Sequence, residues 1–161
     1  GIMDGEKRRM MEAVRSVLSS TGMEFERILD EPAYKLVHRG SAGTWDIIVF
    51  ADEEKSALSF ICPKVYRVEA GHPETLRVLN HINANTLLGK LIFIEEQKTI
   101  SAVLTIPLES GRIPPELVRR GLSSLIAVVE HVTPYIRSTH GEEEPASEPA
   151  VLPKSSPANM N

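Results

Sequence analysis

The sequence has little cysteine, few aromatic residues and no long hydrophobic run. Cys62 is its single cysteine, so no internal disulfide can form, which is typical of a protein in a reducing compartment. Aromatic residues make up 5% of the chain, so any core is built mainly from Leu, Ile and Val. No apolar run approaches the ~20 residues of a membrane-spanning helix. We therefore expect a cytoplasmic protein without membrane association.

The chain also lacks an excess of positive charge. Its formal net charge is −4, which argues against a field that would attract nucleic acid or an anionic membrane. The 161 residues favour one domain plus a tail, and the hydrophobic fraction of 42% is ordinary for a globular protein. Composition therefore indicates a small acidic domain that does not bind nucleic acid.

Helical and alternating hydrophobic patterns follow one another in a regular order. The patterns predict an α+β fold with an antiparallel sheet and the order α-β-β-β-α-β-β-α, with room for one more short strand in residues 23–29. The predicted helices are 4–21, 73–89 and 114–137, and the predicted strands are 34–39, 44–51, 56–62, 90–95 and 98–106.

Several boundaries are less regular. Residues 63–72 are expected to be a connector that is partly extended and anchored by Val65 and Val68. Pro134 is expected to end or kink the last helix. The residues of the second helix that are expected to face inward are Leu76, Leu79, Ile82 and Leu87. The Pro-, Glu- and Ser-rich composition after Ser138 predicts a flexible tail, so we expect one domain at 1–138 and a tail at 139–161.

One stretch resembles a known family. Leu79-Asn80 with Asn83, then Gly89, then Ile106-Pro107-Leu108, is followed by the amphipathic helix 114–136, and this order resembles the YbjN-like family. Such proteins are similar in fold to type III secretion chaperones, small acidic α+β dimers that hold an effector segment in extended form. The resemblance covers most of residues 4–138 and implies a non-enzymatic, protein-binding or regulatory role. The Pro-rich tail is not part of the family pattern.

No residue set predicts catalysis or metal binding. Cys62 has no neighbouring base that could activate it, so it is best interpreted as a small core residue. The five histidines lack the spacing of a zinc site, and the acids Asp52, Glu53 and Glu54 fall in a predicted turn. We expect no catalytic residue, no cofactor and no metal.

The pair Asn80 and Asn83 allows two interpretations. Because they lie three residues apart on one helix, their amides share a face. They are expected mainly to bond nearby backbone, such as a strand end. The alternative is a small-molecule sensor domain with a pocket near Asn80 and Asn83, in which His81 contributes a third polar group.

Partner contacts are predicted on the sheet and on the last helix. Apolar residues on both faces of 44–51 indicate that this strand is central, or that a partner covers one face. The apolar arc of the last helix is wider than one seam requires, which favours a homodimer. The candidate partner-binding residues are Trp45, Ile48, Phe50, Phe60, Leu122 and Val129.

Overall fold

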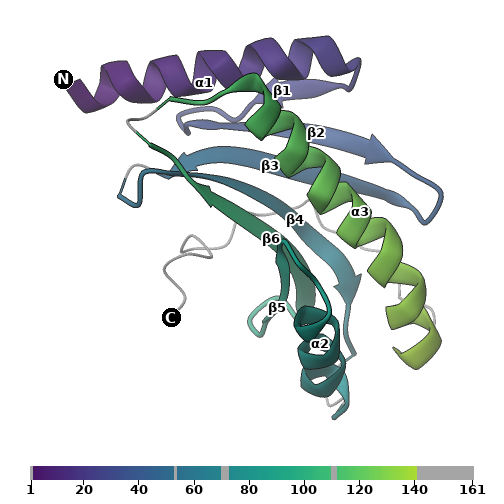
Figure 1. Cartoon of the computed structure of the whole chain (residues 1–161). Coiled ribbons are helices and arrows are strands. Elements are labelled where there is room, and N and C mark those ends of the chain that lie inside the picture. Colours follow the sequence, from purple (N-terminus) through teal and green to yellow (C-terminus); the bar gives the residue numbers. More distant parts are fainter. Residues whose placement is uncertain (1, 53, 70–72, 110–111, 141–161) are drawn as a thin grey trace.

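The fold, a computed structural model, is a six-stranded antiparallel sheet with helices packed against it (Figure 1). The structure describes residues 2–52, 54–69, 73–109 and 112–140. The described residues form helices α1 (Ile2–Thr21), α2 (Thr75–Ala84) and α3 (Pro115–His140). The strands are β1 (Phe25–Arg27), β2 (Ala33–Arg39), β3 (Thr44–Asp52), β4 (Ala57–Arg67), β5 (Lys90–Ile94) and β6 (Thr99–Pro107). The α+β class and the predicted order of elements are confirmed, and β1 is the additional short strand.

The strands lie side by side in the order β1-β2-β3-β4-β6-β5. The first four follow the chain as a meander, with β3 between β2 and β4 as its two apolar faces predicted. After α2 the chain returns as the β5–β6 hairpin, and β6 pairs with β4 while β5 forms the outer edge. Two short strands, β1 and β5, therefore bound the sheet.

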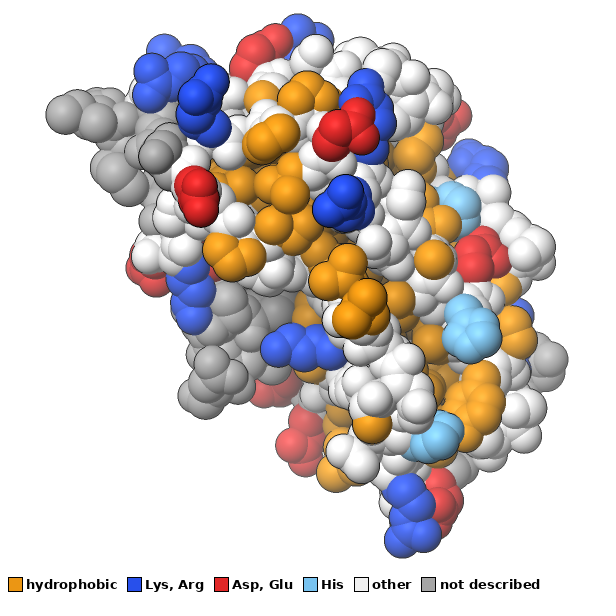
Figure 2. Space-filling model, in the orientation of Figure 1, with side chains coloured by type: hydrophobic (Ala, Val, Ile, Leu, Met, Phe, Trp, Pro, Cys, Tyr) orange, Lys and Arg blue, Asp and Glu red, His pale blue; other side chains and the backbone are white. Residues whose placement is uncertain are grey.

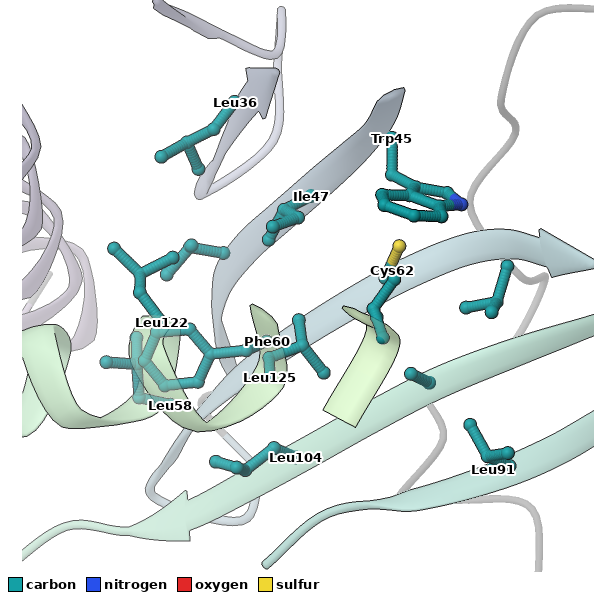
Figure 3. Close-up of a cluster of buried hydrophobic side chains, with 14 of the residues drawn as sticks. Leu36, Trp45, Ile47, Leu58, Phe60, Cys62, Leu91, Leu104, Leu122 and Leu125 are labelled. Atoms are coloured by element: carbon teal, nitrogen blue, oxygen red, sulfur yellow. The ribbon is translucent and has the colours of Figure 1, made fainter. Parts of the chain in front are cut away.

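All three helices pack on the same face of this sheet. The core cluster joins residues from α1, α2 and α3 to alternate residues of the strands, such as Ile47 and Val49 of β3. Figure 3 shows Phe60 of β4 lying beneath Leu122 and Leu125 of α3, with Cys62 and Trp45 farther along the same layer. Alternation in the strands therefore gives each one a helix-covered face and an opposite face.

Strand β4 continues through the residues that were predicted to be a connector. It runs to Arg67, and its pairing with β6 shifts register between Cys62 and Tyr66. Pro63 lies in this irregularity, beyond Ile61, where the pairing with β3 stops. A proline is tolerated in a strand at such a bulge because no ladder hydrogen bond is lost there. The extended character predicted for these residues is confirmed as far as Arg67, and Val65 and Val68 are buried as expected, but the strand does not end at Pro63.

Helix α2 is shorter than predicted. It ends at Ala84, and Gly89 adopts a positive φ of 83° just before β5 instead of closing the helix. Leu76 and Leu87, which were expected to face inward, are 68% and 96% exposed. The inward positions predicted for Leu79 and Ile82 are confirmed, and Val78 is buried beside them.

Helix α3 passes through Pro134 and ends at His140. Of the two outcomes expected at Pro134, an end or a kink, the end is wrong, because packing and hydrogen bonds hold the turns that follow. Ile136 is fully buried, Arg137 Nη1 donates to the carbonyl of Ala42 at 2.9 Å, and His140 Nε2 lies 3.2 Å from Thr75 Oγ1. The helix passes the predicted domain boundary by two residues, and residues 141–161 of the predicted tail lie outside the described residues.

Candidate partner-binding surface

Four of the six predicted contact residues belong to the core of the chain itself. Trp45 and Phe60 point from the sheet toward the helices, and Leu122 points from α3 toward the sheet (Figure 3). Val129 of α3 belongs to the same core cluster. The exposed fractions of these four residues lie between 0% and 7%. Intramolecular packing buries most of the wide apolar arc of α3. The other two candidates, Ile48 and Phe50, lie outside this core cluster; Ile48 is 3% exposed and Phe50 is half-buried.

Ile48 and Phe50 lie on the face of the sheet opposite the helices. We call this face, as formed by the described residues, the helix-free face. Its side chains alternate with those of the core cluster and include Lys35, Val37, Asp46, Ile48, Phe50, Ser59, Ile61, Lys90, Ile92, Ser101, Val103 and Thr105. Its apolar members come from β2, β3, β4, β5 and β6, so the surface crosses most of the sheet.

The strand registers place three of these residues in one line. Ile48 pairs with Ile61, and Ile61 pairs with Val103. We call these three residues the central row. Lys35 lies beside Ile48 at one end of the row, and Lys90 lies beside Val103 at the other. An apolar line with a lysine at each end suits an extended segment that carries apolar and acidic side chains.

Polar groups surround the central row. Ser59 Oγ and Thr105 Oγ1 lie 3.0 Å apart on neighbouring strands. Lys35 Nζ lies 3.1 Å from Glu26 Oε1, and this hydrogen bond raises the pKa of Lys35. Ser101 Oγ is buried and has no hydrogen-bond partner among the described residues. The face thus combines paired polar groups with one buried hydroxyl that lacks a described partner.

The edge strand β5 is closed in part by Asn83. The Leu91 N–H donates to Asn83 Oδ1 at 2.7 Å, and Asn83 Nδ2 donates to the Leu91 carbonyl at 3.0 Å. These bonds satisfy backbone groups that an edge strand otherwise offers to another strand. The expectation that Asn83 serves a nearby strand end is confirmed. Its amide is therefore committed to the fold rather than to a ligand.

A groove of about 820 Å³ runs between α2 and β5. Asn80 lines it, together with Leu76, Leu79 and Phe93. His81, the third group of the predicted sensor pocket, instead stacks on Tyr135 of α3 with ring centroids 6.1 Å apart. Asn83 also lines the groove, but its amide is bonded to Leu91 and His81 is stacked on Tyr135, so the geometry gives no support to a sensor site there.

A second groove was not predicted. It has a volume of about 900 Å³ and lies where α1, the end of β6 and the start of α3 meet, with Met10, Leu108 and Leu117 among its apolar residues. Figure 2 shows apolar side chains gathered on the upper part of the helix-bearing face, with Lys and Arg around them. No sequence signal indicated this groove, because its walls come from three separate segments.

The hairpin between β2 and β3 is attached to α3 through Glu130. Its carboxylate lies 3.0 Å from His38 Nε2 and accepts hydrogen bonds from Ser41 Oγ at 3.0 Å and the Ala42 N–H at 3.1 Å. Partial burial opposes ionisation, but the bonds from His38, Ser41 and Ala42 outweigh it and lower the pKa of Glu130. This network holds the end of the sheet against the helix.

The groups considered for chemistry are dispersed. Cys62 is fully buried, and burial raises the pKa of its thiol, so it is held in the protonated form. Within the part of the chain that the structure describes, no three His, Cys, Asp or Glu residues gather where they could hold a metal ion. Nor does any described helix have the length and hydropathy to cross a membrane.

Comparison with solved structures relates this architecture to two proteins. A chain in the structure of the HopA1–SchA chaperone–effector complex superimposes with a TM-score of 0.56 at 14% identity, covering 74% of this chain and 89% of that chain. YbjN from E. coli superimposes with a TM-score of 0.56 at 16% identity, covering 77% of this chain and 91% of that one. At these identities the likeness concerns the fold.

Sequence comparison defines the family. No curated protein matches the chain. The profile of the YbjN family, described as "Putative bacterial sensory transduction regulator", matches residues 11–138. That range runs from α1 to the last turns of α3 and includes the whole sheet. The chain therefore belongs to the YbjN family, with a fold shared by type III secretion chaperones.

Proposed function

We propose that this protein is a non-enzymatic, chaperone-like or regulatory protein that binds an extended segment of a partner protein. The observation that carries the proposal is the apolar central row of Ile48, Ile61 and Val103 on a sheet face that the described helices leave uncovered. The described helices leave these three apolar side chains uncovered, so another segment has to keep them from water, and a segment of a partner protein can do so. The fold likeness to a chain of a chaperone–effector complex supports the same role.

The binding mode follows from the geometry of the face. Phe50 is half-buried next to the row and offers an aromatic contact at one side. An extended segment that crosses the strands would meet Ile48, Ile61 and Val103 in turn, with the lysines at its two ends. Apolar contacts would supply the affinity and the lysines would select segments with acidic flanks.

We further propose that the protein is a cytoplasmic homodimer. The buried, free Cys62 supports a reducing compartment. Large exposed apolar side chains gather around α2, namely Leu76, Leu87, Leu88 and Tyr135, and such a cluster favours association with a second copy. Size-exclusion chromatography with light scattering tests this proposal. A strict monomer at high concentration would contradict it.

The test of partner binding uses a matched pair of variants. A phage-displayed library of short random peptides is selected on the wild-type protein, and the selected peptides are measured by titration calorimetry against Phe50→Asp and Phe93→Asp. Both phenylalanines are half-buried, but Phe93 pairs with Ile100 on the helix-covered face. Binding should be lost in Phe50→Asp and kept in Phe93→Asp. Equal loss in both variants, or loss only in Phe93→Asp, would place the site elsewhere.

A further inference from the structure

The central row is far more buried than its position predicts. Ile48 is 3% exposed, Ile61 is 1% exposed and Val103 is 2% exposed. Yet these three residues are absent from the core cluster that α1, α2 and α3 form with the opposite face. Side chains on an uncovered sheet face retain contact with water. The described helices therefore do not account for the burial of the row.

A buried polar side chain on the helix-free face leads to the same conclusion. Ser101 is 1% exposed, and its Oγ has no hydrogen-bond partner among the described residues. Ser101 lies on the helix-free face, next to Ile92 of β5. A buried hydroxyl without a partner costs free energy, so it marks a position where another group is expected to bond. Backbone groups of a covering segment have the chemistry that Ser101 requires.

We propose that residues 141–161 of this chain bind across the helix-free face as an intramolecular occupant and compete with the partner segment. This inference rests on the proposed function, because it concerns the regulation of the same surface. The competing segment would shield the row until a partner with higher affinity displaces it.

The last described residue lies close enough for this contact. His140 packs against Tyr66, with ring centroids 5.9 Å apart, and lies 3.2 Å from Thr75, which places it beside the end of β4. From that end of β4 to Ile61 the distance along the strand is roughly 20 Å, at ~3.3 Å per residue. A Pro-rich chain spans ~3.1 Å per residue, so Val151 can reach about 34 Å from His140. The row is therefore within reach even after the chain passes around the sheet edge.

The composition of the segment fits the face. Val151 and Leu152 are adjacent apolar residues that can cover Ile48, Ile61 and Val103. Glu142–Glu144 and Glu148 supply negative charge for Lys35 and Lys90. Prolines recur at 145, 149, 153 and 157 and lack the N–H that a strand ladder needs. Such a segment suits packing on the face rather than addition to the sheet edge.

A second copy of the chain fits the same face poorly. A twofold contact would press two rows together, each ending in Lys35 and Lys90. Lys90 forms no ion pair with any described residue, so its charge would meet other positive charges across such an interface. The acidic, apolar segment of the same chain avoids this repulsion between positive charges. Its effective concentration at the face is set by its tether.

The test changes the segment in the full chain. Val151→Asp with Leu152→Asp removes the apolar pair, and Ser155→Asp with Ser156→Asp adds the same charge without removing an apolar residue. Methyl NMR signals of Ile48, Ile61 and Val103 are compared, with Ile47 on the opposite face as the internal reference. The first variant should shift the signals of the row, and the control variant should not. A synthetic peptide of residues 141–161, added to the first variant, should restore the wild-type positions.

A second measurement separates this inference from the proposed function. The affinity of a selected library peptide should rise about tenfold in the Val151→Asp, Leu152→Asp variant if the segment occupies the face about nine-tenths of the time. Unchanged methyl signals and unchanged affinity, with library peptides still bound, would overturn the inference and leave the proposed function standing. Row signals that shift on dilution of the wild-type protein, but not in the variant, would assign the cover to a second copy. Failure of every library peptide to bind either protein would contradict the proposed function itself.

Discussion

Gly121 of α3 lies directly against the ring of Phe60 on β4. A Cβ atom added at Gly121 would lie 2.2 Å from Cε1 and 2.3 Å from Cζ of that ring. Phe60 is fully buried below α3, so its ring has no free space to move into (Figure 3). The absence of a side chain at Gly121 therefore allows the helix to lie close to its own sheet.

Gly121→Ala should destabilise the protein despite the higher helix propensity of alanine. Overpacking a filled core costs about 1–3 kcal/mol, which exceeds the roughly 1 kcal/mol that alanine gains over glycine in a helix. Urea unfolding monitored by circular dichroism measures the change. Gly5→Ala in α1 is the matched control, because no atom lies within 4 Å of the added Cβ. It should be neutral or stabilising, and equal effects of the two substitutions would contradict the packing interpretation.

Asn83→Ala should loosen the β5 edge. It removes both hydrogen bonds to Leu91 and leaves the Leu91 backbone groups without their side-chain partner, a loss of about 2 kcal/mol. Hydrogen exchange of the Leu91 amide should accelerate well beyond that of the β4 amides. Asn80→Ala is the control, because Asn80 is exposed on the same helix. If Asn80→Ala produced the same acceleration, the effect would belong to the helix rather than to the paired amide.

Glu130→Gln should reduce stability in a pH-dependent manner. The folded-state pKa of Glu130 is below its ordinary value of 4.5, so its carboxylate contributes stability that is fully present above pH ~4.5. This contribution is lost as the pH falls through the lowered folded-state value. The difference in unfolding free energy between wild type and Glu130→Gln should therefore be largest near neutral pH and shrink below pH ~4.5.

The control for that experiment is Glu116→Gln, which changes the net charge equally on the same helix. The Glu116 side chain is 82% exposed and pairs only with Arg119 at 3.1 Å among the described residues. Unfolding followed at several pH values should separate the two variants at neutral pH. A constant difference between wild type and Glu130→Gln down to pH ~3 would contradict the role of the His38–Glu130 network.

Cys62 should resist thiol reagents in the native protein. Its side chain is fully buried and its raised pKa keeps the thiol protonated, so the reactive thiolate is scarce. A chromogenic disulfide reagent at neutral pH should react fully in denaturant and only at the rate of unfolding in buffer. Rapid reaction of the folded protein would show that the layer between β4 and α3 opens more readily than its packing indicates.

Much of the fold could be predicted because local patterns carry it. Apolar residues on both faces of β3 predicted a central strand, and the hydrophobic pattern of residues 114–137 predicted the amphipathic helix α3. The Asn83 amide was expected to serve a strand end, and it binds Leu91. Each of these inferences depends on residues that are close in sequence, where propensity and periodicity determine the outcome.

The contact residues could be predicted only in part. Trp45, Phe60, Leu122 and Val129 have the size and hydrophobicity of interface residues, but those properties do not distinguish an interface from a core. Ile48 and Phe50 differ from Ile47 and Val49 only by their side of β3. Which side the helices cover depends on the crossover from α1 into the sheet and on the return of α3, both of which are long-range.

The sequence alone determined the order of elements, the family and the amphipathic character of each helix and strand, because these follow from periodicity and short-range chemistry. Only the tertiary structure decided that β6 lies beside β4 and that β4 continues past Pro63. It also decided that the Phe60 ring packs against Gly121. It also decided which face of the sheet receives the helices and which keeps Ile48, Ile61 and Val103 apart from them. Alternation provides two faces to every strand, and packing between distant segments selects between them.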